Sequence, residues 1–215
     1  MKERTGHTRF LALGVVFEGF LVVIAIAIGW FFQIDVIRRL HFAAIPAVVG
    51  LAGAVPPFAL LMTTERFQIP ALERIKNLLL ETLGPTLKAC RWYEVVALAL
   101  VAGIGEEFLF RGAIQPILER LTASTGWGWL AGLILSNVIF GLLHCITPTY
   151  AVLAGLMGVY FGLLLDATGT ANLLVPILAH GLYDYLAFLV VIRAAKAMPV
   201  VPHSASSTGD PPGPN

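Results

Sequence analysis

The chain has 215 residues, of which 58% are hydrophobic and only 13% are charged. An average soluble domain carries about twice that share of charged residues, so the composition excludes a soluble globular protein. It also excludes collagen-like, disulfide-rich and intrinsically disordered chains. The net charge of +1 gives no indication of a nucleic-acid partner. The composition therefore predicts an all-α polytopic membrane helix bundle.

Apolar stretches of roughly 20 residues, the length that crosses a bilayer as a helix, recur along the chain. The first two lie at 10–32 and 42–62, so residues 1–62 are interpreted as two N-terminal membrane spans. The second stretch contains Pro56 and Pro57. Membrane helices tolerate proline where neighbouring groups satisfy the freed backbone carbonyls.

Residues 63–94 differ in composition, because charged residues alternate there with apolar residues at helical spacing. Ala71, Ile75, Leu78 and Leu79 fall on one face of such a helix. This pattern predicts an amphipathic helix that lies on the membrane surface.

Residues 95–192 are interpreted as a four-span core, which brings the predicted total to six transmembrane helices. The predicted spans are 95–121, with a kink at Pro116, then 127–146, 150–165 and 173–192. The remaining segment, 193–215, is rich in proline, serine and glycine and is predicted to be disordered.

The distribution of lysine and arginine predicts the orientation. If the N-terminus is cytoplasmic, ten Lys and Arg residues lie on the inner side and three on the outer side. Cytoplasmic loops are the ones enriched in these residues, so both termini are predicted to be cytoplasmic. A short chain without a recognisable targeting peptide is expected in a bacterial cytoplasmic membrane.

Ionisable residues are costly inside a bilayer, at least ~2.5–3.5 kcal/mol each for charged groups on insertion scales. The predicted four-span core nevertheless contains Glu106, Glu107, Arg111, His144, His180 and Asp184. Each of these residues needs a partner, a water-filled cavity or a function, and we therefore treat them as candidate site residues.

Their spacing predicts which of them share a helix face. Glu107 and Arg111 are four residues apart and can pair. Glu106 is turned about 100° from Glu107, so it can face the bundle interior instead. His180 and Asp184 are also four residues apart, on the last span.

A third polar stripe lies on the span at 127–146. It consists of Asn137, Phe140 and His144, which recur at helical spacing. Phe140 is predicted to pack under the site, and Asn137 either supports the site or joins two helices. Polar stripes in lipid must face one another or water, so the three stripes are expected to converge.

The converging groups suit hydrolysis of a carbonyl compound. A carboxylate such as Glu106 can take a proton from a water molecule that His144 holds in place. A second histidine with a polar neighbour, here His180 with Asp184, can stabilise the developing oxyanion.

Three motifs resemble those of the CPBP family, the intramembrane CAAX-prenyl endopeptidases and bacteriocin-processing proteins. Residues 106–111 match its EExxxR motif, 140–144 match FxxxH, and 180–184 match HxxxN/D. The similarity covers about 94–192, roughly half of the chain. It implies an intramembrane protease that acts on a peptide or protein substrate. Membrane-associated and prenylated substrates are both open, because the substrate does not transfer from the family.

The resemblance also implies a role for each matching residue. Glu106 would be the general base and His144 its partner on the water. His180 and Asp184 would stabilise the oxyanion. The residues implied to support the site are Glu107 and Arg111, and no cofactor is implied.

Three alternatives stay open. A zinc protease could use Glu106, His144 and His180 as ligands, although the chain contains no HExxH pair. A non-catalytic membrane scaffold or immunity protein could use the same polar cavity to bind a partner helix. A proton-coupled transporter is a further alternative, because carboxylate–histidine chains also relay protons.

Three other residues carry expectations of their own. Cys90 and Cys145 match no metal-binding spacing and are predicted to be small buried apolar residues. Glu18, inside the first predicted span, is predicted to reach the interface or to pair locally.

Overall fold

The computed structural model describes residues 2–67 and 69–198, and its regular structure within these ranges is entirely helical. The predicted all-α class is therefore confirmed for the described residues. In chain order the helices are α1 (Lys2–Phe31), η1 (Ile37–Arg39), α2 (Ala44–Gly53), α3 (Val55–Arg66), α4 (Pro70–Thr82), α5 (Gly84–Leu87), α6 (Trp92–Glu107), η2 (Phe108–Ile114), α7 (Gln115–Leu121), η3 (Ala123–Thr125), α8 (Gly128–Leu143), α9 (Pro148–Leu164) and α10 (Leu174–Ala197).

Three helical stretches in the described ranges are long and apolar enough to cross a membrane: His7–Phe31, Ala44–Thr63 and Leu174–Ala197. These stretches support the interpretation of the chain as a membrane protein. Helices α8 and α9 are apolar but have only 16 and 17 residues. At 1.5 Å per residue they extend about 24–26 Å, less than the ~30 Å hydrocarbon core. The predicted number of six full spans is therefore not confirmed.

The second membrane stretch is interrupted at Ala54, between α2 and α3. Pro57 has no N–H, so it cannot donate to the carbonyl of Gly53 one turn earlier. The Tyr160 hydroxyl of α9 donates to that carbonyl instead, at 2.8 Å. A neighbouring helix thus satisfies the backbone group that proline releases, as membrane helices require.

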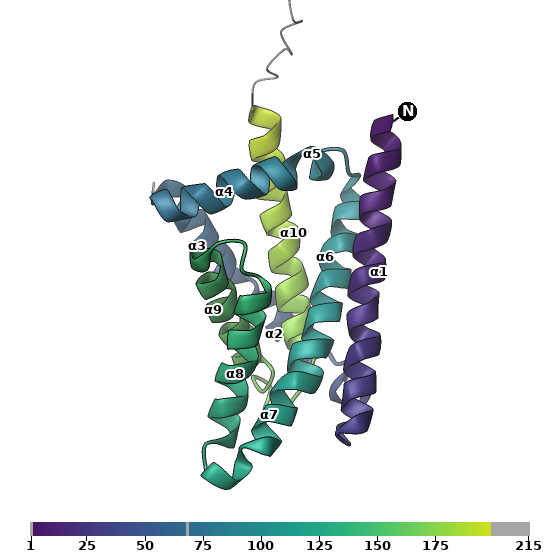
Figure 1. Cartoon of the computed structure of the whole chain (residues 1–215), viewed down its shortest axis with the longest axis vertical. Helices are drawn as coiled ribbons and strands as arrows, with labels where there is room; N and C mark the ends of the chain where they lie inside the picture. Colours follow the sequence, from purple (N-terminus) through teal and green to yellow (C-terminus); the bar gives the residue numbers. More distant parts are fainter. Residues whose placement is uncertain (1, 68, 199–215) are drawn as a thin grey trace, which may run out of the picture.

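Helix α4 lies across one end of the bundle, at the end where α1 begins and α10 finishes (Figure 1). It buries Ile75 and Leu80 against the bundle and exposes charged residues such as Glu73. The predicted amphipathic segment, 63–94, also contains α5 and the first turn of α6. The amphipathic helix α4 is therefore shorter than that segment. The location of α4 on a membrane surface stays a prediction.

The last helix extends beyond its predicted end at residue 192. Helix α10 continues to Ala197, because the sequence of 193–197 consists of alanine, arginine and lysine, which are strong helix formers. The rest of the predicted disordered segment, 199–215, lies outside the described residues.

Two close helix contacts position the centre of the bundle. A Cβ on Gly103 of α6 would lie 2.9 Å from the backbone nitrogen of Gly181 in α10. A Cβ on Gly105 would lie 2.6 Å from the backbone carbonyl oxygen of Glu18 in α1. Glycine lets the backbones of neighbouring membrane helices approach each other closely. Helix α6 is therefore held tightly between α1 and α10 just before it reaches Glu106.

Candidate active site

The two adjacent glutamates of α6 have different surroundings. Glu107 is fully buried, and its Oε1 accepts hydrogen bonds from Arg111 Nη1 at 3.0 Å and from His180 Nδ1 at 2.8 Å. Glu106 keeps 15% of its side chain exposed. Its carboxylate oxygens lie 3.6 Å from His144 Nε2 and 3.7 Å from His180 Nε2. The structure therefore brings Glu106 between two imidazoles and places Glu107 in a buried polar network, in which Glu107 Oε2 has no hydrogen-bond partner among the described residues.

Arg111 anchors that network to the neighbouring helices. Its Nη2 donates to Asn137 Oδ1 of α8 at 2.9 Å and to the Gly158 carbonyl of α9. The guanidinium carbon lies 5.1 Å from the Phe140 ring centroid. A Cβ on Gly158 would overlap the Asn137 amide oxygen, so this position requires glycine. Arg111 is thus fully buried and joins three segments through directional contacts.

Both histidines are oriented by a hydrogen bond at Nδ1. His144 Nδ1 lies 2.9 Å from the Phe140 carbonyl, which can only accept, so this nitrogen carries the proton. His180 Nδ1 donates to the Glu107 carboxylate. In both rings the other nitrogen, Nε2, faces Glu106.

Asp184 lies one turn after His180 on α10. Its Oδ2 is 3.5 Å from His180 Nε2, and 21% of its side chain is exposed. The separations of 3.5–3.7 Å at Nε2 are at or beyond the limit for a direct hydrogen bond. At such separations, one water molecule can form hydrogen bonds to two of these groups at the same time.

A phenylalanine ring lies against each imidazole. Phe140 stacks on His144 with centroids 4.3 Å apart and planes at 29°. Phe161 of α9 stacks on His180 at 4.7 Å and 18°. Phe140 thus packs under the candidate site as its spacing indicated, whereas Phe161 was missed. No local pattern distinguishes Phe161 from the other apolar residues of its helix, and only its contact across the bundle identifies it.

The backbone of the candidate site contains a π-helical segment, η2, directly after Glu107. The sequence predicted an irregularity at Pro116, but the structure places the change in the preceding residues 108–114. Pro116 cannot donate to the carbonyl of Gly112, which leaves the preceding turn free to widen. Segments of π-helix are rare and occur often at functional sites.

Glu18 of α1 is a further residue that sequence reasoning did not place at the site. Its Oε2 is buried and has no hydrogen-bond partner among the described residues. The side chain contacts the position of Gly105 and lies within electrostatic range of Glu106, His180 and Asp184. The expectation that Glu18 pairs locally is wrong, because the close α1–α6 contact turns it toward α6. A charged residue inside an apolar stretch was the available signal.

The ligand atoms of Glu106, His144 and His180 do not form a compact metal-binding triplet. Within residues 2–67 and 69–198, one group of three potential ligands has all its atoms within 4.8 Å of one another, and it lies elsewhere, at His7, Cys90 and Glu94. The spacing at Glu106 suits groups that are joined by water.

The two cysteines are less buried than predicted. Cys145 is exposed and Cys90 is only half-buried. Helix α8 ends at Leu143, so Cys145 lies in the turn that leaves the bundle and not in the apolar interior. The expectation of small buried apolar cysteines is therefore wrong for Cys145.

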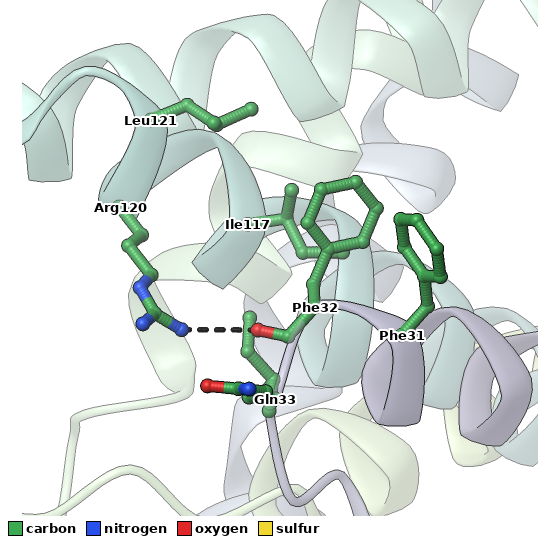
Figure 2. Close-up of a pocket in the computed structure, with 7 residues that line it drawn as sticks. Phe31, Phe32, Gln33, Ile117, Arg120 and Leu121 are labelled. Carbon is green, nitrogen blue, oxygen red and sulfur yellow. Dashed lines mark hydrogen bonds between the residues drawn. The ribbon is translucent and has the colours of Figure 1, made fainter.

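A hollow of about 460 Å³ lies near the far end of α1, at residues 31–34 and α7 (Figure 2). In it, Arg120 Nη1 donates to the Phe32 carbonyl at 3.0 Å. Its side chains include one cation and the Gln33 amide, but no carboxylate or histidine that could act as a base. The ionisable cluster around Glu106 is the stronger candidate for chemistry.

Comparison with known proteins connects this geometry to one family. Residues 88–186 match the family model described as type II CAAX prenyl endopeptidase Rce1-like. The matched range contains the three motifs at 106–111, 140–144 and 180–184. Searches of curated proteins and of solved structures found no match. The matched family consists of proteases and is consistent with the CPBP resemblance. Residues 88–186 of this membrane protein are therefore identified as a type II CAAX prenyl endopeptidase domain of the Rce1-like kind.

Proposed function

We propose that this protein is an intramembrane endopeptidase in which Glu106 activates a water molecule that His144 holds for attack on a peptide carbonyl. The observation that carries the proposal is the position of the Glu106 carboxylate between His144 Nε2 and His180 Nε2. Glu107 cannot take this part, because its Oε1 is engaged by Arg111 and His180.

The reaction proceeds in two proton-coupled stages. Glu106 takes a proton from the water as the water oxygen bonds to the carbonyl carbon, which forms a tetrahedral oxyanion. His180, protonated at both nitrogens, donates from Nε2 to that oxyanion while its Nδ1 donates to Glu107. The intermediate then collapses, the carbon–nitrogen bond breaks, and Glu106 returns its proton to the leaving amine.

Asp184 acts through His180. Its Oδ2 lies 3.5 Å from His180 Nε2, and an ionised aspartate can accept but not donate a hydrogen bond. Asp184 therefore orients the imidazole and balances its charge when the ring is protonated. It does not bind the oxyanion itself while it is ionised.

The substrate approaches from the side of His144 and Asp184. These two side chains are 29% and 21% exposed, whereas those of Glu107 and Arg111 are fully buried. We assign a peptide or protein substrate that is associated with the membrane, with a prenylated C-terminus as the first candidate.

The start of α1 and the end of α10 lie at one end of the bundle (Figure 1), which supports two cytoplasmic termini. The lysine and arginine distribution points to a bacterial cytoplasmic membrane protein with this end inside.

The test is cleavage of a prenylated reporter peptide by the purified full chain in detergent. Glu106→Gln should lower turnover by about 10²–10⁴-fold while the melting temperature is kept, because it removes the base and keeps the shape. Glu81→Gln, the same change on exposed α4, should leave turnover unchanged. Full activity of Glu106→Gln would refute the proposal.

The same assay separates this mechanism from the zinc alternative. If Glu106, His144 and His180 are metal ligands, a chelator should abolish turnover, zinc should restore it, and Glu106→Gln should lose bound zinc. If they act through water, Glu106→Gln should bind as much zinc as the wild type. Binding of the peptide without cleavage by the wild-type chain would support the scaffold alternative.

A further inference from the structure

A second cluster of ionisable side chains lies at the opposite end of α6 from Glu106. It consists of His7 on α1, Cys90 in the turn after α5, and Glu94 in the first turn of α6. A ring nitrogen of His7, the Cys90 Sγ and a Glu94 carboxylate oxygen all lie within 4.8 Å of one another. Three separate segments therefore place one nitrogen, one sulfur and one oxygen atom around the same point.

We propose that His7, Cys90 and Glu94 bind a divalent transition-metal ion, of which zinc is the best suited, and that the ion fastens α1 to the start of α6. Imidazole nitrogen, thiolate sulfur and carboxylate oxygen are the three ligand types of protein zinc sites. The negative charges of the Cys90 thiolate and the Glu94 carboxylate together balance the two positive charges of the ion. The loaded site is then neutral, which suits a location near a membrane surface.

The separations fit a tetrahedral site. With bonds of about 2.0–2.1 Å from zinc to nitrogen and oxygen, two tetrahedral ligand atoms lie about 3.3 Å apart. His7 Nε2 and Glu94 Oε2 are 3.3 Å apart. A sulfur ligand, with a bond of about 2.3 Å, belongs about 3.6 Å from the other two atoms. Because the three atoms lie within 4.8 Å of one another, the Cys90 Sγ needs to move inward by about 1.2 Å at most.

The His7 ring supplies an independent observation. Its Nε2 is buried and has no hydrogen-bond partner among the described residues. It points to Glu94 without the geometry of a hydrogen bond, although buried ring nitrogens are normally paired. A metal ion would satisfy this nitrogen.

The other two ligands both contact neighbouring backbone groups. Glu94 Oε2 accepts a hydrogen bond from the Arg91 N–H at 2.6 Å, an outer contact of the kind that fixes the direction of a metal ligand. The Cys90 thiol donates to the Thr86 carbonyl at 3.3 Å, and metal binding would replace this proton, so the thiolate turns from the carbonyl toward the ion. The side chains of His7 and Glu94 remain 16% and 21% exposed, which leaves a route for an ion and for a water as fourth ligand.

The position of the cluster explains what the ion does. Helices α1 and α6 run in the same direction side by side (Figure 1). Glu18 lies eleven positions after His7, and Gly105, which contacts Glu18, lies eleven positions after Glu94. A clamp between His7 and Glu94 thus fixes the register of the two helices about 16 Å further along, where Glu18 meets the segment before Glu106. The inferred role is structural and does not depend on the proposed peptidase mechanism.

The experiment measures zinc binding by the purified full-length chain in detergent after removal of metal. Zinc is titrated against a chromophoric chelator, and cobalt is used in parallel because a cobalt–thiolate bond produces a charge-transfer absorption band. The variants are His7→Ala and Cys90→Ser, and the matched control is Cys145→Ser, which removes the exposed cysteine outside the cluster. Glu106→Gln tests whether any bound metal belongs to the candidate active site instead.

We expect one zinc ion per chain in the wild type, in Cys145→Ser and in Glu106→Gln, and a cobalt–thiolate band in each. Cys90→Ser should remove the band and weaken binding by more than the roughly 10–100-fold that loss of an outer-shell contact produces. Zinc should raise the melting temperature of the wild type and not that of Cys90→Ser.

Three results would overturn the inference: no zinc bound by the wild type, zinc bound equally by Cys90→Ser, or zinc lost in Glu106→Gln. If His7→Ala cannot be purified, the cobalt spectrum of the wild type still decides, because absence of a thiolate band excludes Cys90 as a ligand. Loss of peptidase activity in Glu106→Gln bears only on the proposed function, so the two proposals fail separately.

Discussion

Replacing Glu107 by glutamine should destabilise the bundle, whereas the same change at Glu106 should not. Glu107 is fully buried and its Oε1 accepts two hydrogen bonds, from Arg111 and from His180. Glutamine keeps the shape but removes the charge, and leaves a buried guanidinium without its bonded carboxylate. Breaking a buried ion pair in this way costs about 3–5 kcal/mol. We expect the lower end, about 3 kcal/mol, because Arg111 keeps Asn137 and the Gly158 carbonyl as acceptors.

The assay is a thermal melt of the purified variants in detergent. In a chain of this size about 3 kcal/mol corresponds to a fall in melting temperature of roughly 6–12 °C. Glu106 makes no contact shorter than 3.6 Å to either histidine, so Glu106→Gln should shift the melt by less than about 2–4 °C. Equal shifts for the two variants would refute the division of the glutamates into a supporting and a reactive residue.

Three further substitutions test the surroundings of the site. Asp184→Asn should keep turnover of the reporter peptide within about tenfold of the wild type, because asparagine can still orient His180 and fits the HxxxN/D motif; a loss as large as that of Glu106→Gln would contradict this role. Gly158→Ala should lower the melting temperature, since its Cβ would overlap Asn137 and displace the acceptor of the buried arginine; an unchanged melt would show that the contact can relax at little cost. Glu18→Gln should leave the melting temperature unchanged or raise it, because it removes the charge of a carboxylate whose buried Oε2 has no hydrogen-bond partner. A fall comparable to that of the Glu107 variant would mean that the carboxylate is paired.

Much of the arrangement around the glutamates followed from helix geometry alone. The rotation of about 100° per residue separates Glu106 from Glu107 on any helix, and spacings of four residues join Glu107 to Arg111 and His180 to Asp184. The structure places these residues as the periodicity indicated. Their roles in catalysis remain predictions.

Other features could not be predicted, because they depend on contacts between segments distant in sequence. Phe161 lies in an apolar helix whose sequence does not reveal which face meets His180. Glu18 is brought to α6 by its contact with Gly105, 87 positions later in the chain. The length of α8 was overestimated because the apolar run continues into the turn at 144–147. There the helix ends through a change in backbone hydrogen bonding, and the polarity of the sequence does not reveal this end.

The stacked phenylalanines have a consequence for proton movement. A histidine relays a proton when it takes one at one nitrogen and releases one from the other, which requires a titratable group at each nitrogen. The Nδ1 of His144 is bonded to the Phe140 carbonyl, which cannot take up a proton, so this ring exchanges protons through Nε2 alone. The Nδ1 of His180 is bonded to the Glu107 carboxylate, so this ring has titratable groups at both nitrogens. The stacked rings of Phe140 and Phe161 hold the two imidazoles in these orientations, and they thereby separate an imidazole that faces only the cavity from one that connects the cavity to the buried carboxylate.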